Sequence, residues 1–462
     1  MQLHSSISAV LLLTSLCSFL QAADDSNDRR PNVLFIAVDD LNHWVGHLGR
    51  NVQTRTPAID RLAGMGVSFS NAHCAAPLCN SSRAALLSGL RPGTTGIYFN
   101  QSPYRSTIQP QQSLVTRFRA AGYETLGMGK LWHGGTGFDE QWTTVGTRPT
   151  GLQARKKITD RSVGGIRFGV LDADDSALSD TATAEFGIRQ LQRSHDKPFF
   201  LTLGFYKPHM PWNVPQKYFD LHPLNDIRLP PTTEDDLADI PEAGLRMAKA
   251  SGDHRVMLNS GRWKEAVQAY LATVSYVDGQ IGRVLDALQD SEHAQNTIIC
   301  LWGDHGWHLG EKQHWRKFAL WEEATRAPLI WVVPGITPAN TICSQPVDFM
   351  SIYPTLCQLA QIPLPGHVEG VSIQPLLQNP SATWNQPAIT TYGPNNHAVR
   401  DQRWRLIRYA DGSQELYDHD TDPLEWTNLA EEKEHSQTIT RLAEFLPVTN
   451  NPEIRPQKKP KP

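Results

Sequence analysis

The chain has 462 residues, of which 40% are hydrophobic and 19% are charged, and its formal net charge is -4. These values describe an ordinary globular protein, long enough for one large α/β domain with a smaller one beside it. The mildly acidic charge, with no basic block interleaved with aromatic residues, gives no reason to expect nucleic acid as a partner.

The first 22 residues have the pattern of an export signal. An apolar core from Ile7 to Leu20 precedes small residues and then an acidic polar stretch. This core is too short for a comfortable membrane span, and no later segment is long and apolar enough. We therefore expect residues 1–22 to be a signal peptide and the protein to be periplasmic or secreted, with no integral membrane segment.

The cysteine count adds a constraint on an exported chain. Without the predicted signal peptide an odd number of cysteines remains, so at least one thiol is free or modified. Cys79 is our candidate for that thiol, and a bridge between Cys343 and Cys357 stays open. The remaining cysteines are Cys74, Cys79, Cys300, Cys343 and Cys357.

Strand-like and helix-like segments alternate along most of the chain. The strand-like runs are almost continuously apolar, as expected for strands that are buried on both faces of a sheet. The pattern predicts an α/β fold with a mostly parallel sheet and helices on both faces. The predicted strands are residues 32–38, 124–127, 199–205 and 297–302, and a predicted helix covers residues 112–121.

Polar residues that can bind a metal or an anion follow each of these strands. In open α/β sheets the ligand crevice lies outside the carboxyl ends of the strands, so we expect these side chains to meet at one edge. In chain order they are Asp39 and Asp40, Lys130 and His133, Lys207 and His209, and Asp304 and His305.

The run from Cys79 to Arg83 begins a predicted helix, because the apolar residues 84–87 follow directly. Side chains four residues apart lie beside one another at the positive end of the helix dipole, where anions bind and thiols can be activated. The alternative is a buried cysteine next to a surface arginine.

The pattern changes towards the C-terminus. Residues 31–374 are expected to form the main, catalytic domain, and residues 375–445 a small α+β subdomain with an antiparallel sheet. Residues 404–409 and 415–417 read as a hairpin within it. The tail, residues 446–462, is predicted to be disordered. Residues 213–263 show no clear periodicity and are the expected place for substrate-specific loops.

Taken together, these motifs resemble those of type I sulfatases of the alkaline phosphatase superfamily, in the branch that includes iduronate-2-sulfatase. The resemblance runs from Pro31 to about Leu429 and implies an alkaline-phosphatase-like fold. It departs from the family pattern at Ser81, where proline or alanine is usual. It is carried by Val38 to Leu41, Cys79 to Arg83, Gly129 to His133, Gly204 to Pro211, Gly303 to Trp307, Lys317 with Trp321 and Glu322, and Glu415 to Asp418.

The acidic residues after the first and fourth strands suit a hard divalent cation. Three carboxylates and one imidazole make a set of ligands dominated by oxygen, and zinc would call for more histidines. The resemblance implies one calcium ion, with the modified Cys79 as a further ligand. The predicted metal ligands are Asp39, Asp40, Cys79, Asp304 and His305.

The resemblance also implies that a formylglycine-generating enzyme converts Cys79 to formylglycine. In its hydrated form this residue attacks sulfur with one hydroxyl, and the second hydroxyl expels sulfate as the aldehyde reforms. Arg83 would hold the modified side chain and neutralise charge, while Lys130 and Lys317 would bind the sulfate oxygens.

Histidines supply the proton transfers that this chemistry needs. The resemblance implies that His133 assists deprotonation of the second hydroxyl and that His209 protonates the leaving alcohol. Lys207 and His397 are weaker candidates for substrate contacts, and Lys207 reads almost equally well as a surface lysine.

The sequence thus predicts an exported, calcium-dependent sulfatase acting on a sulfated polysaccharide or its oligosaccharides. Trp132, Trp212 and Trp307 could stack on sugar rings, although aromatic residues near loops more often serve packing. One alternative is a phosphodiester or phosphonate monoester hydrolase on the same scaffold. Another is a glycan-binding protein that has lost turnover, a reading that only Ser81 favours.

Overall fold

The computed structural model describes residues 30–147 and 161–456. The predicted signal peptide and the last residues of the predicted tail lie outside these ranges. Within them, no helix combines the length and the apolar character needed to cross a bilayer.

A central sheet of eight strands, in the order β14-β2-β13-β10-β1-β8-β4-β5, forms the middle layer of the main domain. Its five strands from β10 to β5 run parallel, and β13 joins β10 antiparallel, so the predicted mostly parallel sheet is confirmed. The strands are β1 (Asn32–Val38), β2 (Val67–Phe69), β4 (Glu124–Gly129), β5 (Thr144–Val145), β8 (Phe199–Phe205), β10 (Thr297–Gly303), β13 (Leu329–Val332) and β14 (Thr341–Cys343).

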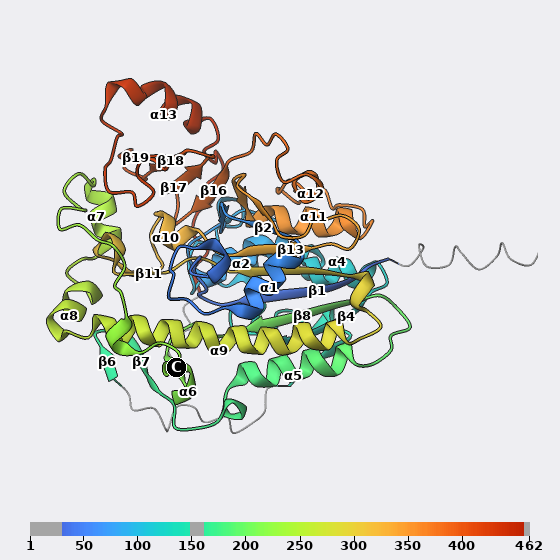
Figure 1. The fold of residues 1–462 in the computed structure, drawn as a ribbon. Helices are drawn as coiled ribbons and strands as arrows, with labels where there is room; N and C mark the ends of the chain where they lie inside the picture. Colours follow the sequence, from blue (N-terminus) through green and yellow to red (C-terminus); the bar gives the residue numbers. More distant parts are fainter. Residues whose placement is uncertain (1–29, 148–160, 457–462) are drawn as a thin grey trace, which may run out of the picture.

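Helices cover both faces of this sheet, as predicted (Figure 1). Alternate residues of β1 point to opposite sides: Leu34 belongs to one core cluster and Phe35 to the other. The first cluster contains residues of α1 (Pro57–Met65), α5 (Ser179–Leu191) and α9 (Trp263–Gln289). The second contains residues of α2 (Cys79–Ser88), α4 (Leu114–Ala120), α11 (Ile352–Leu359) and α12 (Gln374–Gln378).

The predicted elements match the observed ones closely. β1 and β8 have the predicted bounds, and β10 ends one residue later. β4 runs on to Gly129 because it pairs with β8 as far as Gly204, a register that local apolarity does not reveal. The stretch without clear periodicity holds short elements, namely β9 (Trp212–Val214), α6 (Gln216–Phe219), α7 (Glu242–Ala248) and α8 (Asp253–Ser260).

The C-terminal subdomain is a four-stranded antiparallel sheet with a helix packed on it, as predicted. The predicted hairpin is formed by its last two strands. Leu376 and Leu377 of α12, which directly follow the predicted domain boundary, are buried in the second core cluster. The elements are β16 (Ala388–Thr391), β17 (His397–Arg400), β18 (Trp404–Arg408), β19 (Gln414–Asp418) and α13 (Ser436–Ala443).

Small elements complete the described fold. β3 (Ala72–His73) pairs with β15 (Val347–Asp348), and β11 (His308–Leu309) pairs with β12 (Trp315–Arg316). β6 (Arg161–Val163) and β7 (Ile166–Val170) form a sheet with β9. The remaining short helices are α3 (Pro92–Thr95) and α10 (Glu322–Thr325).

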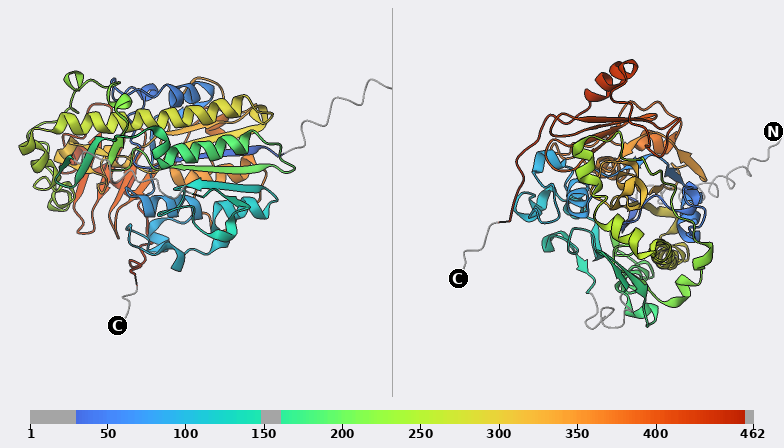
Figure 2. Two further views of the ribbon diagram at one scale, coloured as in Figure 1. Left: turned by 90° about the horizontal axis from the view of Figure 1, so that it is seen from below. Right: turned by 90° about the vertical axis from the view of Figure 1, so that its left-hand side faces the viewer.

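The segment after α13 is ordered, contrary to the predicted disordered tail. In the right-hand view of Figure 2 it leaves the C-terminal subdomain and runs along the main domain. The amide of Asn451 donates to the Gly93 carbonyl at 2.8 Å, and that of Ile454 to the Gly96 carbonyl at 2.9 Å. The prediction is therefore wrong for residues 446–456, because backbone pairing with a distant segment leaves no trace in a polar, proline-rich composition.

The cysteines of the described residues are all buried free thiols. The bridge between Cys343 and Cys357 that the sequence left open is therefore not formed.

Candidate active site

The polar residues that follow the strands do meet at one edge of the sheet. Pairing between neighbouring strands continues just past their ends: the amide of Asp304 donates to the Val38 carbonyl at 3.1 Å, and that of Lys130 to the Gly204 carbonyl at 2.8 Å. Asp39 directly follows Val38, which is the last residue of β1. The parallel register of β1, β4, β8 and β10 therefore carries these side chains to one place.

Asp40 sits in a tight turn that the rest of the fold holds in place. Its φ is 59°, in the left-handed region, and its amide donates to Asp304 Oδ1 at 2.9 Å. The hydroxyl of Tyr270, from the middle of α9, donates to the Asp40 carbonyl at 3.0 Å and accepts from the Asn42 amide at 3.0 Å. Neither Tyr270 nor Asn42 was predicted as a site residue, because neither belongs to a recognisable motif.

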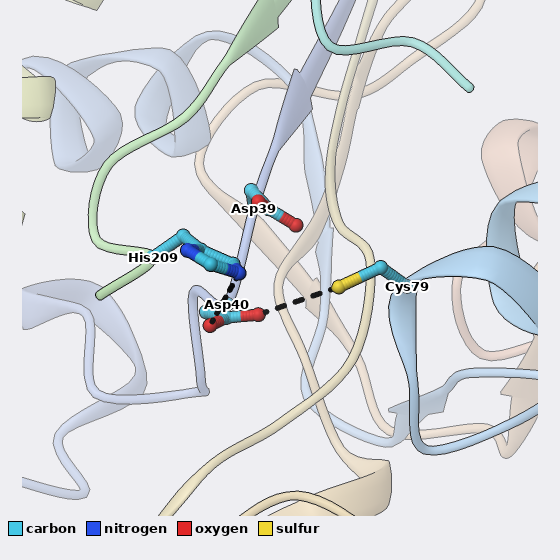
Figure 3. A group of neighbouring side chains, drawn as sticks. All are labelled: Asp39, Asp40, Cys79 and His209. Carbon is cyan, nitrogen blue, oxygen red and sulfur yellow. Dashed lines mark hydrogen bonds and ion pairs between the residues drawn. The ribbon is translucent and has the colours of Figure 1, made fainter. Parts of the chain in front are cut away.

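Cys79 is the first residue of α2, and its Sγ faces the carboxylates. Sγ lies 3.7 Å from Asp40 Oδ1, 3.4 Å from His305 Nε2 and 2.9 Å from Lys317 Nζ. Figure 3 shows Cys79 pointing from the start of its helix towards Asp40, with His209 on the other side of that carboxylate. Residues from four separate parts of the chain thus surround one sulfur atom.

Arg83 lies behind this group and ties the strand ends together. Its Nε donates to Asp304 Oδ2 at 2.8 Å, and its Nη2 lies 3.4 Å from Asp39 Oδ1. Its Nη1 donates to the carbonyls of Lys130 and Leu131. Arg83 is fully buried, so the alternative reading of a surface arginine is wrong.

Ammonium groups balance the remaining carboxylate charge. Lys130 Nζ pairs with Asp39 Oδ2, and Lys317 Nζ donates to Asp40 Oδ1 at 2.6 Å. His305 Nδ1 lies 2.9 Å from the Gly306 carbonyl, which places its proton on that nitrogen. The lone pair of Nε2 therefore points into the cluster.

The protonation states follow from burial and these contacts. Burial alone would raise the pKa of Asp39, but the charges of Lys130, His209 and Arg83 together outweigh it and the net pKa is lowered. Burial also opposes ionisation of Asp304, yet the Arg83 guanidinium holds its pKa well below the usual range. For Cys79, burial and then the charge of Asp39 raise the pKa of the thiol. The expected activation of this thiol by its helix terminus is outweighed by these effects.

The residues of this cluster fit a hard divalent cation. Two overlapping groups of possible ligands share Asp39 and Cys79, with the ligand atoms of each group within 4.8 Å of one another. One group adds Asp40 and His209, and the other adds Asp304 and His305. Among the described side chains, Asp40 Oδ2 is a buried oxygen without a hydrogen-bond partner, as expected of an oxygen that binds a metal ion.

The two histidines predicted to move protons lie beside the cluster. His209 is 39% exposed, and its Nε2 is 3.9 Å from Asp40 Oδ2. Its Nδ1 lies 2.7 Å from the Met210 carbonyl. His133 is more enclosed: burial and then the charge of Lys130 lower its pKa to about 4, so its ring is neutral at physiological pH.

Comparison with known proteins now decides the family. The family described as Sulfatase matches residues 31–362, and the family described as N-sulphoglucosamine sulphohydrolase, C-terminal, matches residues 310–451. The chain belongs to the sulfatase family. It is thus a sulfuric ester hydrolase of the type I class in the alkaline phosphatase superfamily, as its motifs predict.

Individual relatives agree with this assignment. The sulfatase is 40% identical to a protein named Sulfatase from Formosa agariphila, over 95% of this chain and 92% of that protein. It is 30% identical to human iduronate 2-sulfatase, over 77% of this chain and 74% of that protein. Its fold also matches a solved phosphonate monoester hydrolase of Agrobacterium radiobacter with a TM-score of 0.76, at 22% identity, over 90% of this chain and 94% of that one. The fold alone therefore does not separate the two activities.

Two residues of the sulfatase that were predicted to contact the substrate form hydrogen bonds within the protein instead. Lys207 is buried, and its Nζ donates to Asn213 Oδ1 at 2.7 Å and to the Pro211 carbonyl. This lysine therefore braces its own loop, and its burial contradicts the alternative of a surface lysine. His397 is buried in β17, with Nδ1 3.0 Å from Thr391 Oγ1, and no described contact joins it to the Cys79 cluster.

The tryptophans proposed to stack on sugars serve packing instead. Trp132, Trp212 and Trp307 are 1%, 0% and 2% exposed, so no ring face is open to a ligand. The apolar cores on either side of the sheet extend up to the site loops and enclose these rings.

Proposed function

We propose that this sulfatase is an exported, calcium-dependent enzyme that cleaves sulfate esters of a sulfated polysaccharide or its oligosaccharides through a formylglycine made from Cys79. The observation that carries the proposal is the position of Cys79 Sγ, at a helix start and 2.9 Å from Lys317 Nζ, among carboxylates braced by Arg83. The substrate class rests on the similarity to human iduronate 2-sulfatase.

Calcium would be held by Asp39, Asp40, Asp304 and His305, with the modified residue 79 completing the set. The bound ion supplies a positive charge that polarises a sulfate oxygen and lowers the pKa of a coordinated hydroxyl. The ring of His305 already presents its Nε2 lone pair to this place, and Arg83 fixes Asp304 and Asp39 from behind. The cluster is therefore arranged before any ligand arrives.

Formylglycine, once hydrated, supplies two hydroxyls on one carbon, of which one attacks sulfur and the other allows sulfate to leave. Lys130 and Lys317 have ammonium groups on either side of the site, on Asp39 and Asp40 respectively. Both would donate to sulfate oxygens and stabilise the charge that develops on them. Burial of both lysines strengthens this interaction, because water screens it little.

Two histidines divide the proton transfers. His133 is neutral at physiological pH and can accept a proton from the hydroxyl that does not attack. His209 lies at the more open side of the site, where the alcohol leaves, and would protonate that oxygen from Nε2. The S–O bond to the alcohol breaks as this proton is transferred, so the leaving group departs neutral.

The modification of Cys79 is tested by mass spectrometry. Protein produced together with a formylglycine-generating enzyme should show an aldehyde in the peptide that contains residue 79, and a Cys79→Ala variant should be inactive. A Cys74→Ala variant is the matched control, because Cys74 is an equally buried thiol outside the cluster and should leave activity unchanged. An unmodified thiol in fully active protein would refute this part of the proposal.

The reaction class and the metal are tested by turnover. We expect 4-nitrophenyl sulfate to be hydrolysed faster than 4-nitrophenyl phosphate, and EGTA to abolish activity until calcium is restored. Faster hydrolysis of the phosphate would favour the phosphonate or phosphodiester alternative. Activity that survives chelation would refute the calcium site.

The substrate and the location need separate measurements. Tetrasaccharides prepared from heparin, chondroitin sulfate and ulvan, each assayed for sulfate release, would identify the sugar class. Export is tested by N-terminal sequencing of protein from the native host, where we expect cleavage near residue 22. A mature chain that still begins at residue 1 would contradict the signal peptide.

A further inference from the structure

A segment near the C-terminus packs against the main domain. We name residues 449–456 the C-terminal strap. Besides the pairing of Asn451 and Ile454 with the main domain, the hydroxyl of Tyr98 donates to the Asn451 carbonyl at 2.9 Å. At Gly96, whose φ is 70°, a Cβ atom would lie 2.4 Å from the Pro452 carbonyl oxygen, so the two backbones are in direct contact. The strap is therefore a fixed part of the surface.

A shallow, open cleft of about 450 Å³ lies between the strap and the main domain. It is lined by Phe99 and Gln101 on one side and by Glu453, Arg455 and Pro456 on the other. Such a combination of aromatic, amide and charged groups can bind a charged sugar. The aromatic ring packs on the apolar face of the sugar, and the polar groups form hydrogen bonds with the sugar oxygens.

Aromatic side chains connect this cleft to the Cys79 cluster. Lys317 Nζ is 5.9 Å from the ring centre of Phe318, which is 6.4 Å from that of Tyr392, which in turn is 6.0 Å from that of Phe99. All three rings are partly exposed. In addition, Asn80, next to Cys79, donates from Nδ2 to the Phe99 carbonyl at 2.8 Å. Phe318, Tyr392 and Phe99 therefore form a row of ring contacts that leads from Lys317 to the edge of the cleft.

The more exposed of the two charged groups that line the cleft is the guanidinium of Arg455. The side chain of Arg455 is 79% exposed, whereas that of Glu453 is 15% exposed, and Arg455 Nε donates to Glu453 Oε2 at 2.9 Å. The carboxylate thus lies beneath the guanidinium and orients it. A guanidinium with outer nitrogens towards solvent matches a carboxylate or a sulfate group.

We propose that this cleft is a second saccharide subsite, where the sugar next to the one being desulfated packs on Phe99 and pairs its anionic group with Arg455. This subsite rests on the proposed function. It further implies that the substrate is at least a disaccharide and carries a second negative charge. The occupant is a sulfated saccharide because a row of ring contacts links the cleft to the proposed sulfate-ester site, and because an exposed guanidinium stands beside an aromatic ring in the cleft.

The test compares two variants of opposite expected sign on two substrates. With the tetrasaccharide that the parent enzyme cleaves fastest, Arg455→Ala should raise KM about tenfold, the effect of one lost charge-assisted hydrogen bond. Glu453→Gln should lower KM, because it removes a negative charge beneath the bound anion. With 4-nitrocatechol sulfate, which cannot reach the cleft, both variants should match the parent.

The control is Arg61→Ala, which removes another exposed arginine, paired with Asp286 beside α9. If Arg455→Ala and Arg61→Ala give the same KM for the tetrasaccharide, the subsite is overturned while the sulfatase activity stands. If the parent hydrolyses neither substrate, the proposed function fails and the subsite with it. A tetrasaccharide whose carboxylates have been reduced identifies the anion that Arg455 binds. If Arg455→Ala still raises KM for this substrate, the anion is a sulfate group. If it no longer raises KM, the anion is a carboxylate.

Discussion

His209 differs from the other polar residues of the site in its exposure. Its side chain is 39% exposed, whereas that of Asp40 beside it is 1% exposed. A group that must protonate a departing alcohol has to reach the side from which the substrate enters, and the loop after β8 gives His209 that place. Its role can therefore be separated from metal binding by the choice of leaving group.

We expect His209→Gln to lower kcat/KM for an alkyl or sugar sulfate by about 10²–10⁴-fold, the usual effect of losing a general acid. The loss should be far smaller for 4-nitrophenyl sulfate, because 4-nitrophenolate leaves without a proton. Steady-state kinetics on both substrates measure the difference. An equal loss on both would instead assign His209 to binding the metal or the sulfate.

Glu311 provides a prediction about stability at the scale of one residue. It is buried, and its Oε2 accepts from the Leu309 amide at 2.7 Å. Burial and then repulsion from Glu323 raise its pKa from 4.5 to about 8. Between these values the folded protein binds more protons than the unfolded chain, so this group makes the free energy of unfolding fall as the pH rises.

The variant Glu311→Gln keeps an acceptor for the Leu309 amide but cannot ionise. We therefore expect its melting temperature to fall less than that of the parent between about pH 5 and pH 8, the window set by the raised pKa. Thermal unfolding at several pH values measures this. Glu242→Gln, at a side chain 72% exposed, is the control and should follow the parent. Parallel curves for all three proteins would contradict the prediction.

Sequence reasoning at this scale was strongest where a residue directly follows an apolar strand. Asp39, Lys130 and Asp304 were found because parallel strands end at one edge, so a local pattern fixes a position in space. Tyr270 was missed because its role comes from the packing of α9 beneath the turn at Asp40. Lys207 also follows a strand, but its loop returns at Asn213 and engages the ammonium group, which spacing cannot reveal.

At the scale of elements, the segment that presents Lys317 is unusual. Arg316 and Phe318 on either side of it have φ values of 79° and 76°, which side-chain-bearing residues rarely adopt. His314 bridges this segment to α7: its Nδ1 is 2.8 Å from the Ala248 carbonyl and its Nε2 is 2.6 Å from the Lys317 carbonyl. The surrounding contacts must hold a backbone that would relax in isolation.

We expect His314→Ala to let this segment relax and to lower kcat/KM on 4-nitrophenyl sulfate about 100-fold, as small misplacements of catalytic groups do. The control is His222→Ala, since His222 is another buried histidine, with Nε2 2.9 Å from Ser275 Oγ. Melting temperatures and kinetics of both variants separate the two effects. If both lose stability and activity in proportion, His314 has no positioning role.

The strands and helices themselves were largely readable from sequence, whereas this segment was not. The bounds of β1 and β8 were predicted to the residue, because an uninterrupted apolar run bounded by polar residues indicates where a buried strand begins and ends. The left-handed residues around Lys317 have no sequence signal, since neither is glycine or asparagine. Contacts with distant segments fix their conformation. Arg316 pairs with His308 of β11 and donates from Nε to Asp253 Oδ2 at 2.6 Å, and the Phe318 amide donates to the Pro77 carbonyl in the loop before α2 at 3.2 Å.

At the scale of the whole molecule, a buried ion network joins the main domain to the C-terminal subdomain. Arg405 in β18 pairs with Glu322 of α10, and its Nε lies 2.6 Å from Glu425 Oε1. The Glu322 amide also donates to Glu425 Oε2 at 2.8 Å. The subdomain and its hairpin were predictable from local patterns, but these ion pairs were not, because charged partners far apart in the chain share no local pattern.

This network distinguishes Arg405 from Arg403, although both are arginines of the same hairpin paired with acidic side chains. Arg405 is 1% exposed, whereas Arg403 is 50% exposed and pairs with Asp418 at 2.6 Å. When one partner of a buried ion pair is removed, the other is left with uncompensated charge in a region without water. When one partner of an exposed ion pair is removed, water solvates the other, so the loss of stability is small. The two positions therefore give a matched test of what connects the subdomain to the main domain.

We expect Arg405→Ala to lower the free energy of unfolding by about 3–5 kcal/mol, because Glu322 and Glu425 lose the buried guanidinium that lies between them. Arg326, Arg400 and His419 remain near these carboxylates and compensate part of their charge. Arg403→Ala should change it little. Urea unfolding followed by tryptophan fluorescence gives both values, and limited proteolysis should cut the Arg405 variant first within the C-terminal subdomain. Similar stability of the two variants would mean that apolar packing alone holds the subdomain, and that the buried charges are neutralised without Arg405.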